Sequence, residues 1–224
     1  MTNQPKLKLR YDKPAPTVCD YDFARQNDSP EAGWEKWSLP LGNGFFGASI
    51  FGRVGRERIQ ITENSLCNPP LRGSHWRDGS GGLRSFCDVM LEFPHDDVTD
   101  YSRGLDLDAA LADVKYTCGG VRYEREYFTS YPDRVLAVRL SASRAGALSF
   151  DCSLYDPFLR DYCIKEGDGC GKSATFSGEG NILSESGVSH YYNILFEARL
   201  AVLNFGGELK NENGKISVSG ADSA

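Results

Sequence analysis

Short segments that alternate apolar and polar residues, separated by glycine-rich turns, limit most strongly what this chain can fold into. The segments VKYTC (114–118) and VRYEREYFTS (121–130) both alternate with a period of two, and Gly119-Gly120 separates them. Such alternation is typical of a half-buried strand, and a two-glycine connection is typical of a tight turn. This region is therefore predicted to form a β-hairpin.

The same pattern recurs along the chain. Further runs are DVMLEF at 88–93, RVLAVRLSA at 134–142, ALSFDCSLY at 147–155, the apolar stretch at 190–204, and KISVSG at 215–220. Only residues 106–113 have the pattern of a short helical turn. Many strands with almost no helix predict an all-β fold, a large antiparallel β-sandwich. The sequence has no internal repeat or shift in composition, so residues 1–224 are expected to form one domain.

Charge and composition narrow the classes of partner. The net charge is −6, from 25 basic and 31 acidic residues that are mixed along the chain. Without a basic stripe, neither nucleic acid nor an anionic membrane is an expected partner. No apolar run approaches the roughly 20 residues of a membrane helix. The polar N-terminus lacks the apolar core of a signal peptide, so we expect a cytoplasmic protein.

The seven cysteines are odd in number and form no C-x-x-C pair, which favours reduced thiols. No metal and no cofactor is predicted. A zinc site that combines some of these cysteines with His75, His95 or His190 is an alternative that no spacing supports.

Gly42, Gly44 and Gly47 form a literal G-x-G-x-x-G in the stretch LPLGNGFFGASIFG. In a dinucleotide-binding turn these glycines would follow a strand and open a helix. Here more glycines follow, and then the alternating run at 58–62, so a helix is not expected. The three glycines are better explained by a sharp turn or hairpin.

Three other motifs suggest chemistry but have simpler explanations. The segment EGDGCGKS at 166–173 ends like a phosphate-binding loop but has Glu166 in place of the first glycine, which favours a surface loop. Asp106 and Asp108 are expected to cap a helix N-terminus rather than act as an acid–base pair. Glu124 and Glu126 lie on one strand face, which predicts a solvated row of charge.

Glu63 and Asn64 are harder to assign. They lie in the segment TENSL, where the strand at 58–62 is expected to end and a long polar loop at 64–82 to begin. That loop contains His75 and Trp76. The carboxylate and the amide could line a polar pocket, or they could bond the local backbone of a turn.

Taken together, the longer motifs resemble one enzyme family. WSLPLGNGFFGASIFG, ERIQITENSLCNPP, the long segment DVMLEF…RVLAVRLSA and the closing FEARLAVLNFGGELKNENGKISVSGADSA occur in the order seen in glycoside hydrolase family 95. That family contains α-L-fucosidases and some α-L-galactosidases. The resemblance runs from about residue 6 to the last residue.

The resemblance implies that residues 1–224 are the N-terminal β-sandwich of a longer enzyme. The chain is then expected to stop before a linker and an (α/α)6 catalytic barrel. It implies an inverting mechanism, in which an acid and an activated water act on opposite faces of the sugar. Both groups would belong to the barrel, so no catalytic residue is predicted in this chain. The expected partners are the barrel itself and the fucosylated oligosaccharide substrate.

The resemblance places Asn43 in the glycine turn. If the strands on either side of residues 54–56 pair, Glu63 and Asn64 return beside Asn43. These three residues are therefore our candidates for an interface with the barrel or for the rim of its pocket. Local turn bonding is the competing explanation.

The sequence departs from the family at Cys67, where the family has tryptophan. If that tryptophan contacts the sugar or the barrel in relatives, this protein handles a different substrate.

A stand-alone carbohydrate-binding module is the alternative function. Its sugar-stacking residues would be aromatic and exposed; the candidates are Trp34, Trp37, Trp76, Tyr191 and Tyr192.

Overall fold

The computed structural model describes residues 7–17, 36–68, 82–156, 172–190 and 193–224. Trp34, His75, Trp76, Tyr191, Tyr192 and residues 166–171 of the glycine-rich loop lie outside these ranges. Within them the protein is built of strands with almost no helix, which confirms the predicted all-β sandwich. No helix in the described ranges is both long and apolar enough to cross a membrane.

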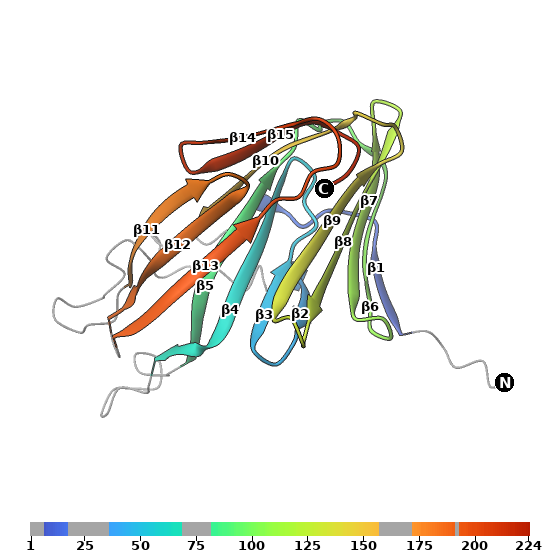
Figure 1. Ribbon diagram of the computed structural model, residues 1–224. Helices are drawn as coiled ribbons and strands as arrows, with labels where there is room; N and C mark the ends of the chain where they lie inside the picture. Colours follow the sequence, from blue (N-terminus) through green and yellow to red (C-terminus); the bar gives the residue numbers. More distant parts are fainter. Residues whose placement is uncertain (1–6, 18–35, 69–81, 157–171, 191–192) are drawn as a thin grey trace.

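The strands form three antiparallel sheets (Figure 1). In spatial order, the five-stranded sheet contains β1 (Lys8–Tyr11), β6 (Thr99–Asp106), β7 (Leu111–Cys118), β8 (Val121–Ser130) and β9 (Val135–Ala142). The seven-stranded sheet contains β14 (Glu208–Glu212), β15 (Lys215–Ala221), β10 (Leu148–Tyr155), β5 (Gly82–Glu92), β4 (Arg56–Asn68), β3 (Phe46–Ile50) and β2 (Leu39–Gly42). The three-stranded sheet contains β11 (Lys172–Glu179), β12 (Ile182–Ser189) and β13 (Ile194–Ala201).

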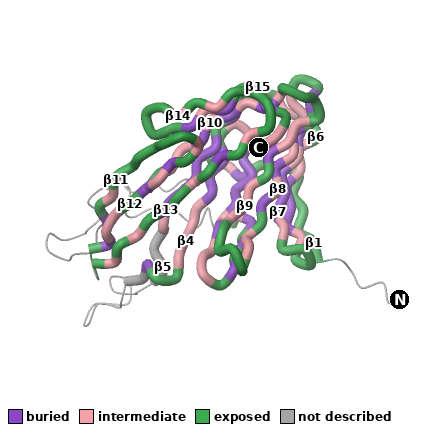
Figure 2. Tube along the Cα trace, viewed as in Figure 1, coloured by how far each residue is buried: buried purple, intermediate pink, exposed green. Residues whose placement is uncertain are grey.

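The seven-stranded sheet is one layer of the sandwich. The five- and three-stranded sheets lie side by side over its inner face and form the other layer (Figure 1). The buried residues in Figure 2 therefore gather between the layers. The core includes Ile59, Val89, Phe150, Tyr127 and Leu183, contributed by all three sheets. This burial follows the alternation in the sequence, because every second residue of a strand faces the same way.

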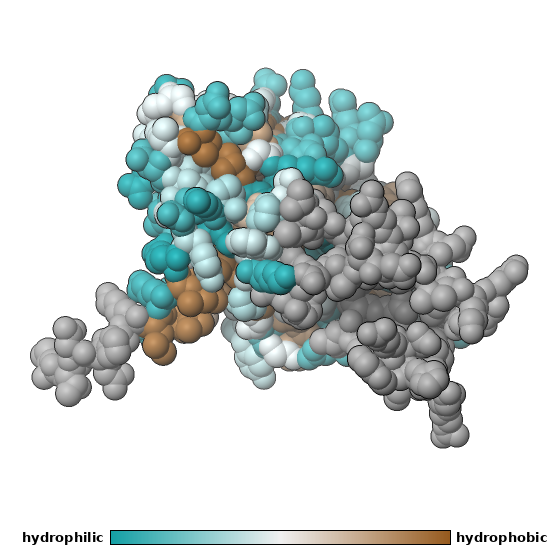
Figure 3. All heavy atoms as spheres, turned by 180° about the vertical axis from the view of Figure 1, so that it is seen from behind, coloured by the Kyte–Doolittle hydropathy of each residue, from teal (hydrophilic) through white to brown (hydrophobic). Residues whose placement is uncertain are grey.

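The surface of the molecule differs from its core in hydropathy. Figure 3 shows that the described residues on one side of it are mainly hydrophilic and that apolar residues form only small patches. On the outer face of the five-stranded sheet, the outward residues of β8 are also charged: Glu124 pairs with Lys115, and Glu126 lies 3.3 Å from Arg139. The solvated charge row predicted for β8 is therefore confirmed.

Glycine turns join several strands as the sequence predicts. Gly119 and Gly120 have φ angles of 56° and 74° between β7 and β8. Asn213 and Gly214 have φ angles of 52° and 73° between β14 and β15. Two successive residues with positive φ are the signature of the type I′ turn, whose twist matches that of paired strands.

The glycine stretch at 42–47 forms the β2–β3 hairpin. Gly42 pairs with Gly47 across it, and Gly44 has a φ of 85°. The strands β3 and β4 follow, where a nucleotide-binding turn would need a helix. The hairpin prediction is confirmed.

The predicted helical turn at 106–113 is wrong. Asp106 ends β6 and Leu111, its partner across the hairpin, begins β7. The four residues between them are too few for a helix with its capping residues. Asp106 nevertheless caps amides: its Oδ1 accepts hydrogen bonds from the Asp108 and Ala109 amides at 3.1 and 3.2 Å. Aspartate satisfies free amides in tight turns as well as at helix ends, and for this reason the two look alike in sequence.

The boundary at residue 64 is also corrected. The sequence predicts that the strand at 58–62 gives way to a loop beginning at Asn64, but β4 continues to Asn68 and pairs with β5 again at Cys67. The register shifts between Thr62 and Cys67. Such an irregularity allows polar residues within a strand, because it interrupts the alternation.

Candidate functional site

Asn43 joins two sheets at one end of the sandwich. Its Oδ1 accepts hydrogen bonds from the amides of Phe45 and Phe46, both at 3.0 Å, which fixes the β2–β3 turn. Its Nδ2 donates to the carbonyl of Ser130, at the end of β8, at 2.8 Å. Asn43 is 8% exposed. The side chain therefore holds the seven-stranded sheet against the five-stranded sheet.

Glu63 and Asn64 come back to this turn as predicted. Glu63 is the cross-strand partner of Phe46, and the Asn64 amide donates to the Phe45 carbonyl at 3.0 Å. The Asn64 side chain donates to the carbonyl of Gly44. The Glu63 carboxylate accepts from the Ser65 amide at 2.8 Å and from the Ser65 hydroxyl. The three candidates thus form one corner, and each makes local hydrogen bonds; their role toward a barrel or a sugar stays a prediction.

Aromatic and cationic side chains that the sequence analysis did not single out complete this corner. The rings of Phe45 and Tyr131 lie 5.5 Å apart, and the Arg134 guanidinium lies 3.9 Å from the centre of the Phe45 ring. Tyr131 is 67% exposed. The only sequence signal was the turn YPDR between two strands. We use "the corner" below for Asn43, Phe45, Glu63, Asn64, Tyr131 and Arg134.

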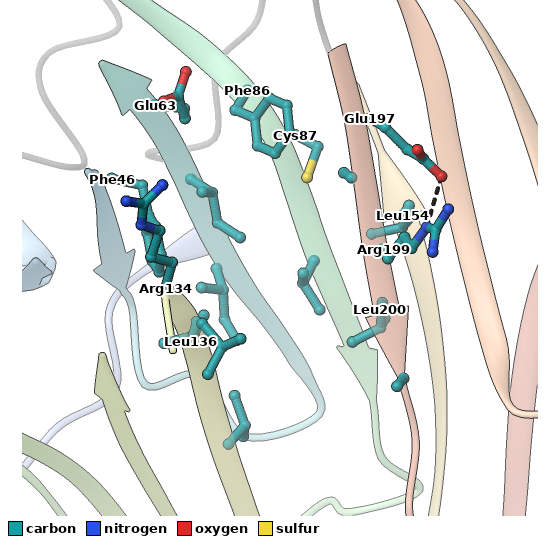
Figure 4. A pocket seen from close by; sticks show the side chains of 17 residues that line it. Phe46, Glu63, Phe86, Cys87, Arg134, Leu136, Leu154, Glu197, Arg199 and Leu200 are labelled. Atoms are coloured by element: carbon teal, nitrogen blue, oxygen red, sulfur yellow. Dashed lines mark hydrogen bonds and ion pairs between the residues drawn. The ribbon is translucent and has the colours of Figure 1, made fainter. Parts of the chain in front are cut away.

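A groove begins at the corner and runs between the five- and three-stranded sheets. It consists of two adjoining pockets of about 390 and 350 Å³, which share residues of β5, β9 and β13. Figure 4 shows its apolar side chains, with Glu63 and Arg134 near one end and the Glu197–Arg199 ion pair (2.6 Å) on the β13 wall. Glu63 therefore lies at the rim of a groove within this chain. A mostly aliphatic lining offers few hydrogen bonds to a sugar.

Buried ionic groups lie between the five- and seven-stranded sheets. Arg125 on β8 and Glu57 on β4 are 3.5 Å apart and almost fully buried. Arg125 donates to the carbonyls of Arg53 and Val54, both at 2.6 Å, and to the Tyr116 hydroxyl at 2.7 Å. Burial raises the pKa of Glu57, and the positive charge of Arg125 opposes that shift.

Neighbouring aromatic groups enclose this ion pair. The Arg125 guanidinium lies 3.8 Å from the centre of the Phe93 ring. The Tyr127 hydroxyl lies 3.2 Å from Glu57, and His95 shares a 2.8 Å hydrogen bond with the Tyr116 hydroxyl. Burial, and then the charge of Arg125, lower the pKa of His95. These contacts connect strands of both layers.

A second ionic cluster lies between the three- and seven-stranded sheets. Lys172, at the start of β11, forms an ion pair with Asp156 and donates to the Phe86 carbonyl at 2.7 Å. Glu185 on β12 is fully buried beside them, and neither of its oxygens meets a hydrogen-bond donor in the described residues. Burial and the adjacent Asp156 carboxylate raise the pKa of Glu185 to about 8. A protonated Glu185 can donate to Asp156, which leaves the cluster neutral.

Neither ionic cluster can act on a polysaccharide. A glycosidase places two carboxyl groups on either side of an accessible sugar. Glu57, Asp156 and Glu185 instead lie inside the sandwich. The sequence analysis missed all three; the available signal was that Glu185 falls two residues after Leu183, on the inward side of an alternating strand.

The remaining predicted sites are accounted for where the structure describes them. His95 is buried and bonded to tyrosine, and Cys87, Cys118 and Cys152 are free thiols. No group of three or more metal-binding side chains occurs among the described residues. Trp37 is 37% exposed and its carbonyl accepts a hydrogen bond from Arg103; the other four candidate stacking residues lie outside the described ranges.

Comparison with known proteins identifies the class of domain. The family model described as glycosyl hydrolase family 65, N-terminal domain, matches residues 9–68 and 71–224. The chain belongs to this family of N-terminal domains, and its described residues form a β-sandwich.

Three curated relatives refine the class. Alpha-L-fucosidase 2 of Arabidopsis thaliana is 30% identical over 158 residues, which are 55% of this chain and 19% of the relative. A protein named probable alpha-fucosidase A from Aspergillus niger is 26% identical over 145 residues, 47% of this chain and 18% of its own. A protein of the same name from Aspergillus oryzae is 24% identical over 153 residues, which are 51% of this chain and 21% of the relative. The match thus spans about a fifth of each relative.

Proposed function

We propose that this domain belongs to a glycoside hydrolase that removes α-L-fucosyl, or α-L-galactosyl, residues from oligosaccharides. The similarity to alpha-L-fucosidase 2 is the observation that carries the proposal. The sequence motifs favour family 95 and an inverting mechanism. In this proposal the acid and the group that activates water lie in an (α/α)6 barrel outside residues 1–224, and the sandwich supports that barrel.

The buried carboxylates support a non-catalytic role for this domain. An inverting enzyme needs its two carboxyl groups about 6.5–9.5 Å apart across the sugar. Glu57 is held by Arg125, and Asp156 by Lys172, inside the sandwich. We therefore expect residues 1–224 alone to show no turnover of a chromogenic α-L-fucoside. Turnover by the purified domain that disappears with a substitution inside it would contradict this.

We further propose that the corner faces the barrel. It combines directional polar groups, Glu63 and Asn64, with an exposed ring, Tyr131, and a cation, Arg134. Such a mixture is suited to an interface between domains, because aromatic and arginine side chains contribute strongly there. Contact with the substrate itself is a narrower version of the same proposal.

The test compares activity with stability in the full-length enzyme. Glu63→Gln and Asn43→Ala should lower kcat/KM for an α-L-fucoside by more than their loss of melting temperature in residues 1–224 explains. Glu124→Gln is the matched control, because Glu124 is an outward carboxylate paired with Lys115. Wild-type activity in both corner variants would remove the corner from the proposal and leave the fucosidase assignment intact.

A carbohydrate-binding module remains the competing function, and titration distinguishes it. If residues 1–224 bind fucosylated oligosaccharides with a Kd of about 1 mM or tighter, and Tyr131→Ala abolishes that binding, the corner is a sugar site. If no heat of binding is detected, the interface proposal stands.

A further inference from the structure

The groove separates two strand edges that no described strand covers. β9 is the last strand of the five-stranded sheet, and β13 is the last strand of the three-stranded sheet. Leu136 and Val138 on β9 and Leu200 on β13 line both pockets of the groove, and Val89 of β5 lies on its floor. Strand edges with unpaired amide and carbonyl groups can pair with strands of other molecules unless another segment covers them.

The last residues of the chain already enter this groove at one end. Ser223 bridges Ser141, just beyond Leu140 on β9. The Ala224 amide donates to the Leu140 carbonyl at 3.0 Å, and the Leu140 amide donates to the Ala224 carbonyl at 2.7 Å. These reciprocal bonds define an antiparallel pair on the open edge of β9. Ala224 itself lines the second pocket.

We propose that the groove is the seat of one extended strand, formed by the residues that follow position 224 in the longer polypeptide. The curated relatives are about five times the length of the aligned region, so their chains are long enough to contain such a segment. The strand would run antiparallel to β9, away from Leu140 toward Val135 and the corner. It would join the five- and three-stranded sheets into one continuous layer. This inference does not depend on which sugar the parent enzyme cleaves.

Strand geometry fixes the register of this segment. Alternate residues of β9 direct their amide and carbonyl groups to the same edge, so Val138 and Leu136 offer theirs where Leu140 does. As residue numbers fall along β9 they rise along the new strand. Position 226 therefore faces Val138, and position 228 faces Leu136. Both side chains would point with Leu140 toward the core.

The lining determines the chemistry of the occupant. Ile59, Ile61, Val89 and Leu154 form the floor, and Leu200 forms part of one wall. Apolar side chains at positions 226 and 228 would bury against them, whereas a charge there would lose its hydration without gaining a partner. The groove contains charged groups at Glu63 and Arg134 near the corner and at Glu197 and Arg199 on the β13 wall.

The test compares residues 1–224 with the same chain extended by about ten of its encoded residues, the length of a long strand. Extension should slow amide hydrogen exchange at Leu136 and Val138 by more than about tenfold. It should also raise the melting temperature. The encoded residues at positions 226 and 228 should be apolar.

A pair of variants makes the test specific. Val138→Asp places a charge in the groove and should abolish the increase in amide protection and in melting temperature that extension produces. Arg139→Asp introduces the same side chain on the exposed face of β9 and should keep the gain. Measuring the gain within each background separates it from any general loss of stability. The proposal is wrong if extension leaves exchange at Leu136 and Val138 unchanged, if positions 226 and 228 are charged, or if those amides become protected only when two copies of residues 1–224 associate.

Discussion

The two halves of the sandwich, one under the five-stranded sheet and one under the three-stranded sheet, stabilise their buried charged groups in different ways. Beneath the five-stranded sheet, Arg125 donates three short hydrogen bonds and lies beside Glu57. Glu57 also accepts hydrogen bonds from the backbone amides of Gly52 and Arg58. Beneath the three-stranded sheet, Lys172 forms an ion pair with Asp156, and the Glu185 carboxyl group meets no hydrogen-bond donor among the described residues. The first cluster pairs its charges, whereas the second balances them by keeping a proton on a carboxyl group.

The difference shows that burial alone does not set the ionisation of a buried acid. Burial raises the pKa of both Glu57 and Glu185. A positive neighbour and several amide donors oppose the rise at Glu57. At Glu185, a second carboxylate adds to the rise. The half of the domain that contains Glu185 should therefore respond to pH near neutrality.

The largest expected effect comes from removing Arg125. Arg125→Met leaves Glu57 buried without its cation and should reduce the free energy of unfolding by about 3–5 kcal/mol. Arg139→Met, which breaks the exposed pair with Glu126, should cost about 1 kcal/mol or less. Urea unfolding of both variants measures the difference. If Arg125→Met is as stable as Arg139→Met, the ion pair does not hold these sheets together.

The next largest effect concerns how the free energy of unfolding depends on pH. The folded-state pKa of Glu185, about 8, lies above its ordinary value of 4.5. The folded state therefore binds the proton more tightly, and its contribution to stability is complete below about 4.5 and is lost as the pH rises to about 8. Wild type should lose more than about 1 kcal/mol between roughly pH 5 and 8.5 through this group.

Glu185→Gln isolates that contribution, because glutamine stays neutral at every pH. Thermal unfolding should show a flatter dependence on pH for this variant than for wild type. His95, whose lowered pKa acts in the opposite direction at acidic pH, is present in both proteins and cancels in the comparison. Parallel pH profiles would mean that Glu185 is ionised in the folded state.

The smallest effect is expected outside both halves, in the β2–β3 turn. Gly44 has a φ of 85° and open space around the position of a Cβ atom, so Gly44→Ala costs only the backbone strain, about 1 kcal/mol. Gly55→Ala is the control, because Gly55 lies outside the left-handed region and an added Cβ would make ordinary contacts there. Equal melting temperatures for the two variants would show that the turn is not constrained.

The sequence predicts the strands and turns of this fold well, because they depend on neighbours in sequence. Gly119-Gly120 and Asn213-Gly214 adopt the backbone angles that their residue types favour. The segment at 106–113 was predicted incorrectly, because an aspartate that caps a turn has the same local pattern as one that caps a helix. The end of β4 was misplaced because a shift in register interrupts its alternation.

The candidate site was only partly predictable. Pairing of β3 with β4 brings Glu63 and Asn64 to Asn43, and this follows from the sequence alone. Tyr131 and Arg134 reach the corner from a different sheet, and their proximity to Phe45 depends on how the two layers pack. The same is true of Arg125 with Glu57 and of Lys172 with Asp156, because each pair joins separate sheets.

The strand order of the seven-stranded sheet has a consequence for the kinetics of folding. β6 to β9 and β11 to β13 pair with their immediate neighbours in the chain, so little entropy is lost in closing their loops. The seven-stranded sheet instead joins β5 to β10, which pair Asp151 with Glu92, and then adds β15 beside β10. Contacts between distant residues form late, because a long loop must close before they are made. The hairpins within β6 to β9 and within β11 to β13 should therefore form first, and the pairings of β1 with β6 and of β5 with β10 should form last.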